Sequence, residues 1–365
     1  MDFSELHTWM PSDPDFIPII AGPCGAETCD QVMATAVRLA AQKRIKVFRS
    51  GIWKPRTRPG GFDGAGDPAL VWLCRAREKT GLKLIVEVAT RAHVLACQKA
   101  EIDMFWVGAR TCANPFSVQE IADAVAGMDV PIFVKNPLYP DINLWAGAIE
   151  RFYKAGIRKI AGILRGVYPF EPCCYRNLPK WEMAIDLKLR FPGLPVLCDP
   201  SHMAGDAALV PGLCQKALDL NMDGLMIESH ISPETALCDA GQQLTPESLG
   251  KLLDTLTPRR ESTTDIQFTE TIQTLRLGID EIDRQILALL GERGNLVAKI
   301  GREKVRQNIA ILQIQRWDAI QTTRQDMAKS RGLSPDFVRK LLNLIHEESI
   351  AIQTREMENS AGRQT

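Results

Sequence analysis

The chain has 365 residues and carries 44 basic and 44 acidic side chains, so its formal net charge is zero at neutral pH. This balance gives no support to a nucleic-acid-binding or membrane-surface protein. No apolar run approaches the roughly 20 residues that a transmembrane helix needs. The length accommodates one large domain and one small domain.

The N-terminal segment and the cysteines bear on the cellular compartment. Residues 1–16 contain no basic stretch followed by an apolar core, so we expect no signal peptide. The ten cysteines lack the spacing of a small disulfide-stapled scaffold, and a chain of this size can build a core without disulfides. We therefore expect a cytoplasmic enzyme in which most thiols are free.

Eight short apolar runs rich in β-branched residues lie between residues 17 and 230, and segments of helical character separate most of them. Strands that alternate with helices predict an α/β fold, and eight such strands predict a closed (β/α)8 TIM barrel. In that fold the active site lies at the C-terminal ends of the strands. The runs span 17–24, 46–51, 83–89, 104–110, 131–137, 159–166, 195–202 and 224–230.

The composition of the chain changes near residue 258. All ten cysteines lie at or before Cys238, and 21 of the 22 prolines lie at or before Pro258. We therefore expect a barrel domain over residues 1–256 and a polar linker over 257–267. A small all-α domain is expected over 268–357, and a disordered tail over 358–365.

An apolar stripe with spacings of three and four residues follows the linker and predicts a helix from about Thr269 to Arg306. At 1.5 Å per residue this helix is roughly 55 Å long, and a three-helix unit cannot bury the whole stripe without a partner. Further helices are expected at about 313–330 and 334–357, so we expect an intertwined dimer of three-helix units. The stripe comprises Ile272, Leu275, Ile279, Ile282, Ile286, Leu289, Leu296 and Ile300.

Four residues that can bind a metal lie at or near the ends of the expected strands. Cys24 and His202 end the first and seventh runs, Glu228 lies in the eighth run, and Asp239 follows it. A thiolate, an imidazole and two carboxylates suit a mixed site for Zn, Fe, Mn or Co. A single buried cysteine or loop histidine has an ordinary structural explanation. The expected location of all four residues on one rim of the barrel favours a metal site.

Cationic side chains also recur at these strand ends. Lysine and arginine are seldom found at the inner rim of a barrel without an anion to neutralise them. The recurrence favours binding of phosphate or carboxylate groups, although Arg56 and Arg58 could equally be solvated loop charges. The candidate residues are Arg49, Lys54, Arg56, Arg110, Lys135 and Arg165.

Together the strand-end motifs resemble the 3-deoxy-D-arabino-heptulosonate 7-phosphate (DAHP) synthase family. The likeness covers residues 16–256 and points to the branch that shares its barrel with 3-deoxy-manno-octulosonate 8-phosphate synthase. The motifs are AGPC (21–24), KPRT (54–57), GAR (108–110), VKNP (134–137), RG (165–166), DPSH (199–202), IESH (227–230) and ALCDAGQQLT (236–245).

This resemblance implies a metal-dependent, aldol-like condensation of phosphoenolpyruvate with erythrose 4-phosphate. Lys54 is a candidate proton donor to the new hydroxyl, and a metal-bound water is the alternative. Glu87 and Asp199 could support the metal ligands or form ordinary salt bridges. The implied metal ligands are Cys24, His202, Glu228 and Asp239; the implied phosphoenolpyruvate ligands are Arg49, Lys54, Arg110, Lys135 and Arg165; the implied erythrose 4-phosphate ligands are Arg56 and Thr57.

Polar residues on the helices indicate a second site. Arg293 interrupts the apolar stripe, and Lys304 lies three helical turns further along the same face. Ser349 and Gln353 are four residues apart and share a face of the last helix. An arginine within a helical core needs a counter-anion, although an arginine that extends to solvent is the ordinary alternative.

Residues 268–357 resemble the all-helical chorismate mutase family through the ordered pattern LR, DEID, LLGER, IG, K, R, S and Q. The resemblance implies rearrangement of chorismate to prephenate without a metal or a nucleophile. Arg276 would serve the site of the partner subunit, and Lys304 and Gln353 would hydrogen-bond the ether oxygen as the bond breaks. The implied substrate-binding residues are Arg276, Arg293, Lys304, Arg316, Ser349 and Gln353.

Two positions depart from the mutase pattern. The family usually has acidic side chains where this chain has Gln313 and Trp317. Gln313 can replace an acid as a hydrogen-bonding group, whereas Trp317 cannot do so in the same way. The departure leaves open a weaker mutase or a helical unit that serves regulation.

Three functional hypotheses follow. The first is a bifunctional synthase and mutase of aromatic amino-acid biosynthesis, with prephenate feedback on the barrel. The second keeps the synthase but makes the helical tail a ligand-sensing and dimerising module. The third is the octulosonate synthase, against which the KPRT loop and the fused mutase-like tail argue.

Overall fold

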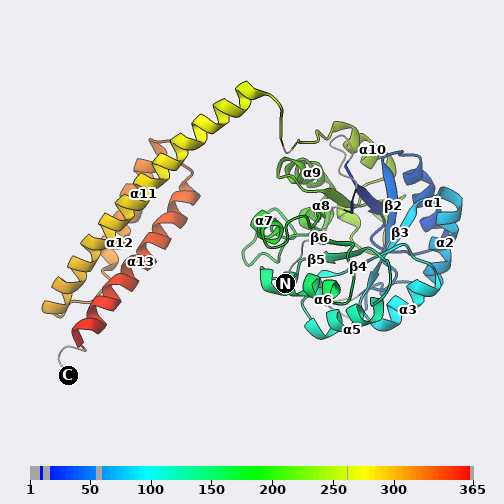
Figure 1. Ribbon diagram of the computed structural model, residues 1–365, viewed down its shortest axis with the longest axis horizontal. Coiled ribbons are helices and arrows are strands. Elements are labelled where there is room, and N and C mark those ends of the chain that lie inside the picture. The colour runs from blue at the N-terminus through cyan, green and yellow to red at the C-terminus, as the bar shows by residue number, and fades with distance from the viewer. Residues whose placement is uncertain (1–8, 11–16, 55–59, 261, 362–365) are drawn as a thin grey trace. The chain divides into compact units, whose positions relative to one another are not determined.

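The computed structural model describes residues 9–10, 17–54, 60–260 and 262–361 (Figure 1). The chain divides into two compact units, Met1–Glu261 and Ser262–Thr365, and each is described by itself. Within the described residues, every helix is too short or too polar to serve as a membrane span.

Eight parallel strands close into a barrel in the order in which they occur in the chain, and pairing of β8 with β1 completes it (Figure 1). The strands are mostly buried apolar residues, as expected for a parallel sheet that is covered on both faces. This closed barrel confirms the predicted fold class. The strands are β1 (Ile19–Gly22), β2 (Ile45–Ser50), β3 (Lys83–Val88), β4 (Met104–Val107), β5 (Ile132–Lys135), β6 (Ile160–Leu164), β7 (Val196–Cys198) and β8 (Gly224–Glu228).

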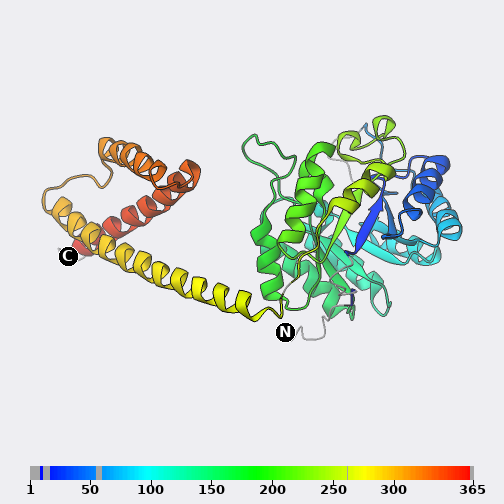
Figure 2. The same ribbon diagram turned by 90° about the horizontal axis from the view of Figure 1, so that it is seen from above.

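Helices follow the strands and form the outer layer of the barrel (Figures 1 and 2). Local sequence explains where several of them begin, because the side chains of Thr28, Thr90 and Asp141 accept hydrogen bonds from the first turn. The helices are α1 (Cys29–Ala40), α2 (Pro68–Thr80), α3 (Arg91–Lys99), α4 (Ala109–Cys112), α5 (Pro115–Val125), α6 (Ile142–Lys154), α7 (Trp181–Arg190), α8 (Pro200–Ala204), α9 (Val210–Asp219) and α10 (Pro246–Thr255).

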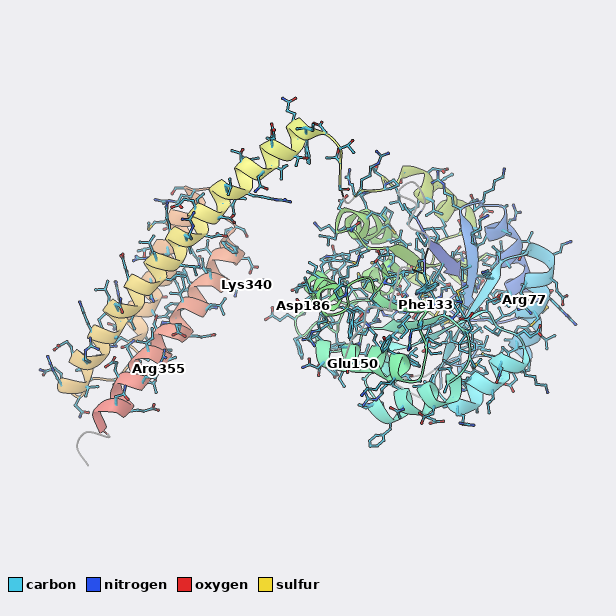
Figure 3. All side chains as sticks on the ribbon, viewed as in Figure 1. Arg77, Phe133, Glu150, Asp186, Lys340 and Arg355 are labelled. Carbon is cyan, nitrogen blue, oxygen red and sulfur yellow. The ribbon has the colours of Figure 1, made fainter. Side chains whose placement is uncertain are left out.

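The barrel unit has an apolar core inside the strands and a second core between the strands and the helices. Figure 3 shows Phe133 inside the barrel, with Arg77 and Glu150 on the surrounding helices. Trp9 lies at the N-terminal end of the strands, where its Nε1 donates to the Ile160 carbonyl at 3.0 Å and its ring contacts Phe133 edge to face. Apolar residues therefore fill the barrel, and the C-terminal ends of the strands carry the polar groups.

The second unit consists of α11 (Ile266–Arg306), α12 (Ile314–Lys329) and α13 (Pro335–Ala361), and α13 packs against both other helices (Figure 2). Val297 and Gly301 are the buried residues of α11. Most of the predicted stripe is exposed to solvent in this single chain, as at Ile279 and Ile282.

Two boundaries of this unit differ from the sequence prediction. Helix α11 begins at Ile266, inside the expected linker 257–267, because the Asp265 side chain caps it by accepting from the Phe268 N–H. Helix α13 continues through Ala361, so residues 358–361 are helical rather than disordered. The sequence has no proline or glycine in this stretch before Gly362 that would end the helix earlier. Residues 362–365 of the expected tail lie outside the described residues.

Candidate functional site

The expected metal donors meet at the C-terminal ends of the strands. Glu228 ends β8 and pairs with Gly22 of β1, two residues before Cys24. The ligand atoms of Cys24, Glu228 and Asp239 all lie within 4.8 Å of one another. The Nε2 atom of His202 lies 3.7 Å from Glu228 Oε1 and 3.9 Å from Asp239 Oδ2. The barrel thus brings together all four side chains, which are separated by up to 215 positions in the sequence.

The orientation of His202 depends on Asp199, which directly follows β7. The Asp199 carboxylate caps α8 by accepting from the His202 N–H at 3.1 Å, and it lies 2.8 Å from the imidazole Nδ1. Nε2 is thereby left facing the two carboxylates, as in metal sites where a carboxylate orients a histidine ligand. Burial lowers the pKa of His202, although Asp199 opposes the shift, and a neutral imidazole is the form that binds a metal.

The electrostatics of Cys24 also fit a cation. Its pKa is raised well above the usual thiol value by its hydrogen bond with Cys238, by burial and by the negative charge of Glu228. A thiolate at this position therefore needs a positive charge nearby. Lys54 supplies one, since its Nζ donates to Cys24 Sγ at 2.9 Å and also to the Cys24 carbonyl. The thiol, imidazole and two carboxylates together fit a divalent ion of the Mn, Fe, Co or Zn kind.

Lys54 is held in its charged form. Burial alone would lower the pKa of Lys54, but the negative charges of Cys24, Cys238 and Glu228 raise it above the ordinary lysine value. The residues that follow, including the expected erythrose 4-phosphate ligands Arg56 and Thr57, lie outside the described residues.

Arg49 and Lys135 are buried cations that lie beside the proposed metal donors and Asp199. Arg49 is buried, lies 3.1 Å from Glu228 Oε1 and stacks over the Trp106 ring at 5.0 Å. Its Nε and Nη1 atoms make no hydrogen bond to any described residue. Lys135 Nζ donates to Asp199 at 2.6 Å. Buried guanidinium N–H groups without acceptors are costly, which favours an anionic ligand at this position.

Arg165 and Arg110 form the other side of the cationic region. Arg165 directly follows β6 and donates to Asn177 Oδ1 at 2.6 Å. Burial lowers the pKa of Arg165 to about 10, with Asp199 opposing the shift and Arg176 and Arg110 adding to it by repulsion. Arg110 lies in α4 and is exposed. Guanidinium groups close enough to repel one another are typical of a site for phosphate or carboxylate.

The structure adds residues that the sequence analysis did not select. Arg176 lies 2.9 Å from Asp239 Oδ1 and donates to Gln242 Oε1 at 2.7 Å. Gln242 in turn donates to Glu228 Oε2 at 2.7 Å. Gln242 falls within the motif at 236–245, so the sequence could have drawn attention to it. Arg176 lies in a loop that has no motif or periodic pattern.

In the helical unit, several of the expected mutase residues meet between α11 and α13. Arg293 Nη1 donates to Ser349 Oγ at 2.7 Å, and Gln353 Nε2 donates to the Ser349 carbonyl at 3.2 Å. The Oε1 atom of Gln353 is buried and has no hydrogen-bond partner among the described residues. Lys304 donates to the carbonyl of Ile311. These side chains can bind a ligand that carries carboxylate and ether oxygens.

The remaining mutase residues are more open. Arg276 and Arg316 are exposed in the single chain. Trp317, at a position where the resemblance leads one to expect an acid, stacks on His346 of α13 with ring centroids 3.9 Å apart. Gln313 precedes α12 and is exposed.

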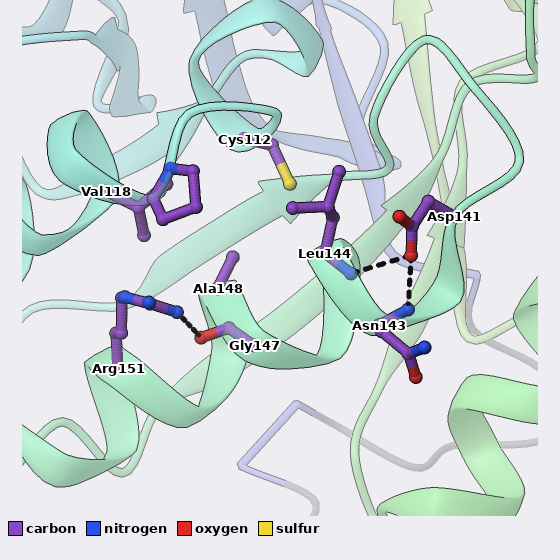
Figure 4. Close-up of a pocket in the computed structure, with 9 residues that line it drawn as sticks. Cys112, Val118, Asp141, Asn143, Leu144, Gly147, Ala148 and Arg151 are labelled. Carbon is purple, nitrogen blue, oxygen red and sulfur yellow. Dashed lines mark hydrogen bonds between the residues drawn. The ribbon is translucent and has the colours of Figure 1, made fainter.

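A separate surface pocket of about 260 Å³ lies on the outside of the barrel, between α4, α5 and α6 (Figure 4). Cys112, Val118 and Leu144 are among its apolar lining residues, and Asp141 and Arg151 are among its charged ones. None of the predicted site residues that the structure describes lines it.

Comparison with known proteins identifies both units. The sequence model of the DAHP synthetase I family matches residues 12–264. The chain belongs to the DAHP synthetase I family. The model of chorismate mutase type II matches residues 275–354. This member of the DAHP synthetase I family is therefore a bifunctional shikimate-pathway enzyme that combines a synthase barrel with a mutase domain.

Individual relatives agree with this assignment. A phospho-2-dehydro-3-deoxyheptonate aldolase of Thermotoga maritima is 30% identical over 238 residues, which cover 65% of this chain and 68% of the relative. A 2-dehydro-3-deoxyphosphooctonate aldolase of Nitratidesulfovibrio vulgaris is 29% identical over 259 residues, covering 65% of this chain and 90% of the relative. The crystal structure of the Thermotoga maritima DAHP synthase matches with a TM-score of 0.59 and 30% identity, covering 66% of this chain and 68% of that chain.

Proposed function

We propose that the barrel condenses phosphoenolpyruvate with erythrose 4-phosphate to give DAHP and inorganic phosphate. Carbon 3 of phosphoenolpyruvate attacks the aldehyde carbon, water adds at carbon 2, and phosphate leaves with its bridging oxygen. The convergence of Cys24, His202, Glu228 and Asp239 beside a buried cationic region carries this proposal.

In this proposal the four donors hold one divalent ion of the Mn, Fe, Co or Zn kind. Such an ion, when bound, polarises the aldehyde oxygen as a Lewis acid. The barrel's cations hold the carboxylate and phosphate of phosphoenolpyruvate in a geometry suited to attack, and Arg56 and Thr57 bind erythrose 4-phosphate. The proposed phosphoenolpyruvate ligands are Arg49, Lys54, Arg110, Lys135 and Arg165.

Lys54 is proposed to give a proton to the hydroxyl that forms from the aldehyde oxygen. It is charged, and its Nζ lies 2.9 Å from the sulfur of Cys24, next to the proposed metal. A positioned ammonium group can stabilise the developing alkoxide and then protonate it.

Phosphate release from phosphoenolpyruvate and erythrose 4-phosphate, before and after chelation, tests the barrel proposal. Cys24→Ala is expected to abolish phosphate release and to leave chorismate turnover in the same chain intact. Equal rates before and after complete metal removal would contradict the metal-dependent mechanism.

The second candidate substrate for the barrel is arabinose 5-phosphate. Several relatives named 2-dehydro-3-deoxyphosphooctonate aldolase, such as the one at 29% identity, justify testing it. Offering the purified protein each sugar phosphate separately decides between the two. We expect turnover with erythrose 4-phosphate, and turnover with arabinose 5-phosphate alone would reverse the assignment.

We further propose that the helical unit rearranges chorismate to prephenate in a homodimer. Arg293, Ser349 and the Gln353 oxygen, which has no hydrogen-bond partner in the described part of the chain, support a site between α11 and α13. Lys304 and Gln353 would contact the ether oxygen, Arg316 would bind a carboxylate, and Arg276 would complete the site of the partner subunit. The exposed stripe of α11 supports a dimer.

Regulation and location complete the proposal. Fusion of the two activities suggests that prephenate inhibits the barrel; a synthase rate that does not change with millimolar prephenate would remove this idea. If the isolated helical unit binds prephenate but does not consume chorismate, the tail is a ligand-sensing module instead.

We propose a cytoplasmic location, in keeping with ten free cysteines.

A further inference from the structure

The loop between β6 and α7 contains a two-residue segment, Arg176–Asn177, that is fixed to helix α8. The Arg176 N–H donates to the Ala204 carbonyl at 3.2 Å, and the Asn177 N–H donates to the Met203 carbonyl at 3.1 Å. Asn177 Nδ2 also donates to the carbonyl of His202 at 2.6 Å. The segment is therefore hydrogen-bonded at three carbonyls to the short helix that carries His202 of the proposed metal site.

The side chain of Arg176 reaches both carboxylates of that site. It contacts Asp239 Oδ1 directly at 2.9 Å, and it reaches Glu228 Oε2 through Gln242 in two hydrogen bonds of 2.7 Å each. These contacts engage one oxygen of each carboxylate. The other oxygens lie near the remaining donors: Asp239 Oδ2 is 3.4 Å from Cys24 Sγ, and Glu228 Oε1, which also accepts from Arg49, is 3.7 Å from His202 Nε2.

The side chain of Asn177 connects the same segment to the cationic region. Its Oδ1 accepts from Arg165 Nη1 at 2.6 Å, and Arg165 is nearly fully buried. A single two-residue segment thus contacts three of the four proposed metal ligands, directly or through one residue, and also Arg165, a proposed phosphoenolpyruvate ligand.

Close packing on α8 keeps this segment in place. Gly205 ends α8 with a φ of +71°, and a Cβ atom added there would lie 2.5 Å from the Cβ of Arg176. Only glycine combines the left-handed conformation with this close approach.

We propose that the segment Arg176–Asn177 positions the residues that bind the metal. The proposal rests on the metal-dependent function of the barrel. Arg176 orients Asp239 and, through Gln242, Glu228, while Asn177 fixes the helix that presents His202. Supporting groups of this kind commonly contribute 10-fold to 100-fold to metal affinity.

Simple charge repulsion predicts the opposite effect, and this makes the proposal testable. A guanidinium group beside a divalent ion disfavours binding of that ion by Coulomb repulsion. If Arg176 were merely a neighbouring charge, its removal would tighten metal binding. If it orients the carboxylates, its removal weakens metal binding.

The experiment titrates Mn²⁺ or Co²⁺ into the metal-free full-length protein at fixed pH, against a chromophoric chelator. We expect the dissociation constant of Arg176→Gln to rise by about 10-fold to 100-fold. Arg176→Lys, which keeps the charge but loses the planar fork, should give an intermediate value. The matched control is Arg259→Gln, which removes a surface ion pair of 2.8 Å with Asp219 and should bind metal like the unmodified chain.

Unchanged or tighter metal binding by Arg176→Gln would overturn the proposal. So would an unchanged metal dissociation constant with a raised KM for phosphoenolpyruvate or erythrose 4-phosphate, because Arg176 would then bind substrate. If Arg176→Gln does not fold, Gln242→Leu breaks only the connection to Glu228 and is still expected to weaken metal binding. An unmodified chain that binds neither ion would instead contradict the proposed function itself.

Discussion

His202 and Asp199 form a pair in which the carboxylate fixes both the backbone and the ring of the histidine. Asp199 accepts from the His202 N–H at 3.1 Å and lies 2.8 Å from Nδ1. One acid therefore caps α8 and directs Nε2 toward Glu228 and Asp239. Because Asp199 is fully buried and also accepts from Lys135, it connects the proposed metal donors to the proposed phosphoenolpyruvate ligands.

Replacing Asp199 with asparagine should weaken metal binding and slow phosphate release, because Asp199 orients both His202 and Lys135. We expect the metal dissociation constant to rise by about 10-fold to 100-fold and phosphate release to fall, because an amide cannot stabilise Lys135 as a carboxylate does. Metal titration and phosphate release measure the two effects. Asp219→Asn, at the surface, is the control, and normal metal affinity in Asp199→Asn would show that His202 is oriented without its help.

The acid stability of the metal-free barrel should depend on the same carboxylate. Burial alone would raise the pKa of Asp199, but His202 and Lys135 hold it well below its ordinary value. The unfolded chain then binds the proton more readily, so the stabilising contribution is present above the ordinary aspartate pKa of about 4 and is lost as the pH falls below it. Thermal unfolding between about pH 3 and pH 7 should show a shallower acid slope in Asp199→Asn, and parallel slopes would contradict this origin.

The mutase proposal makes a separate prediction for Arg293. Its guanidinium donates to Ser349 Oγ at 2.7 Å beside the buried Gln353, and it is one of the cations proposed to bind a substrate carboxylate. Arg293→Gln should lower kcat/KM for chorismate by about 100-fold to 1,000-fold and leave phosphate release by the barrel unchanged. A loss of less than about tenfold would contradict the role of Arg293 as a ligand of the rearranging substrate.

The convergence of the proposed metal donors could be predicted from the sequence because a closed barrel brings the C-terminal ends of its strands together. Cys24 and Glu228 adjoin neighbouring strands, so closure of β8 on β1 places them side by side whatever the loops do. His202 closely follows β7, whereas Asp239 lies further along the loop after β8, and that loop brings it back to the same rim. The α11 stripe was likewise visible, because helical periodicity depends only on the local sequence.

Residues whose positions depend on contacts between loops could not be predicted in this way. Arg176 acquires its role from a loop that meets α8 and the segment around Asp239, and no local pattern encodes that meeting. The stack of Trp317 on His346 depends on the relative register of α12 and α13, which periodicity does not define. Trp317 had appeared only as a departure from a family pattern.

The exposed stripe of α11 leads to the last prediction, which concerns assembly. Ile279, Ile282 and Ile286 are 57%, 56% and 49% exposed in the single chain, an arrangement that exposes apolar surface along one face of a long helix. Ile282→Asp should therefore convert a dimer into monomers in sedimentation experiments, because it places a charge in the interface.

The same variant should lose chorismate turnover, since Arg276 of one subunit is proposed to complete the site of the other. Leu277→Asp is the matched control: Leu277 is 59% exposed but lies off the stripe, so the variant should remain dimeric. If Ile282→Asp stays dimeric, or becomes monomeric with full mutase activity, then the sites do not share Arg276 across this face. Dissociation together with loss of turnover, in a chain that still releases phosphate normally, is the combination that a shared helical site requires.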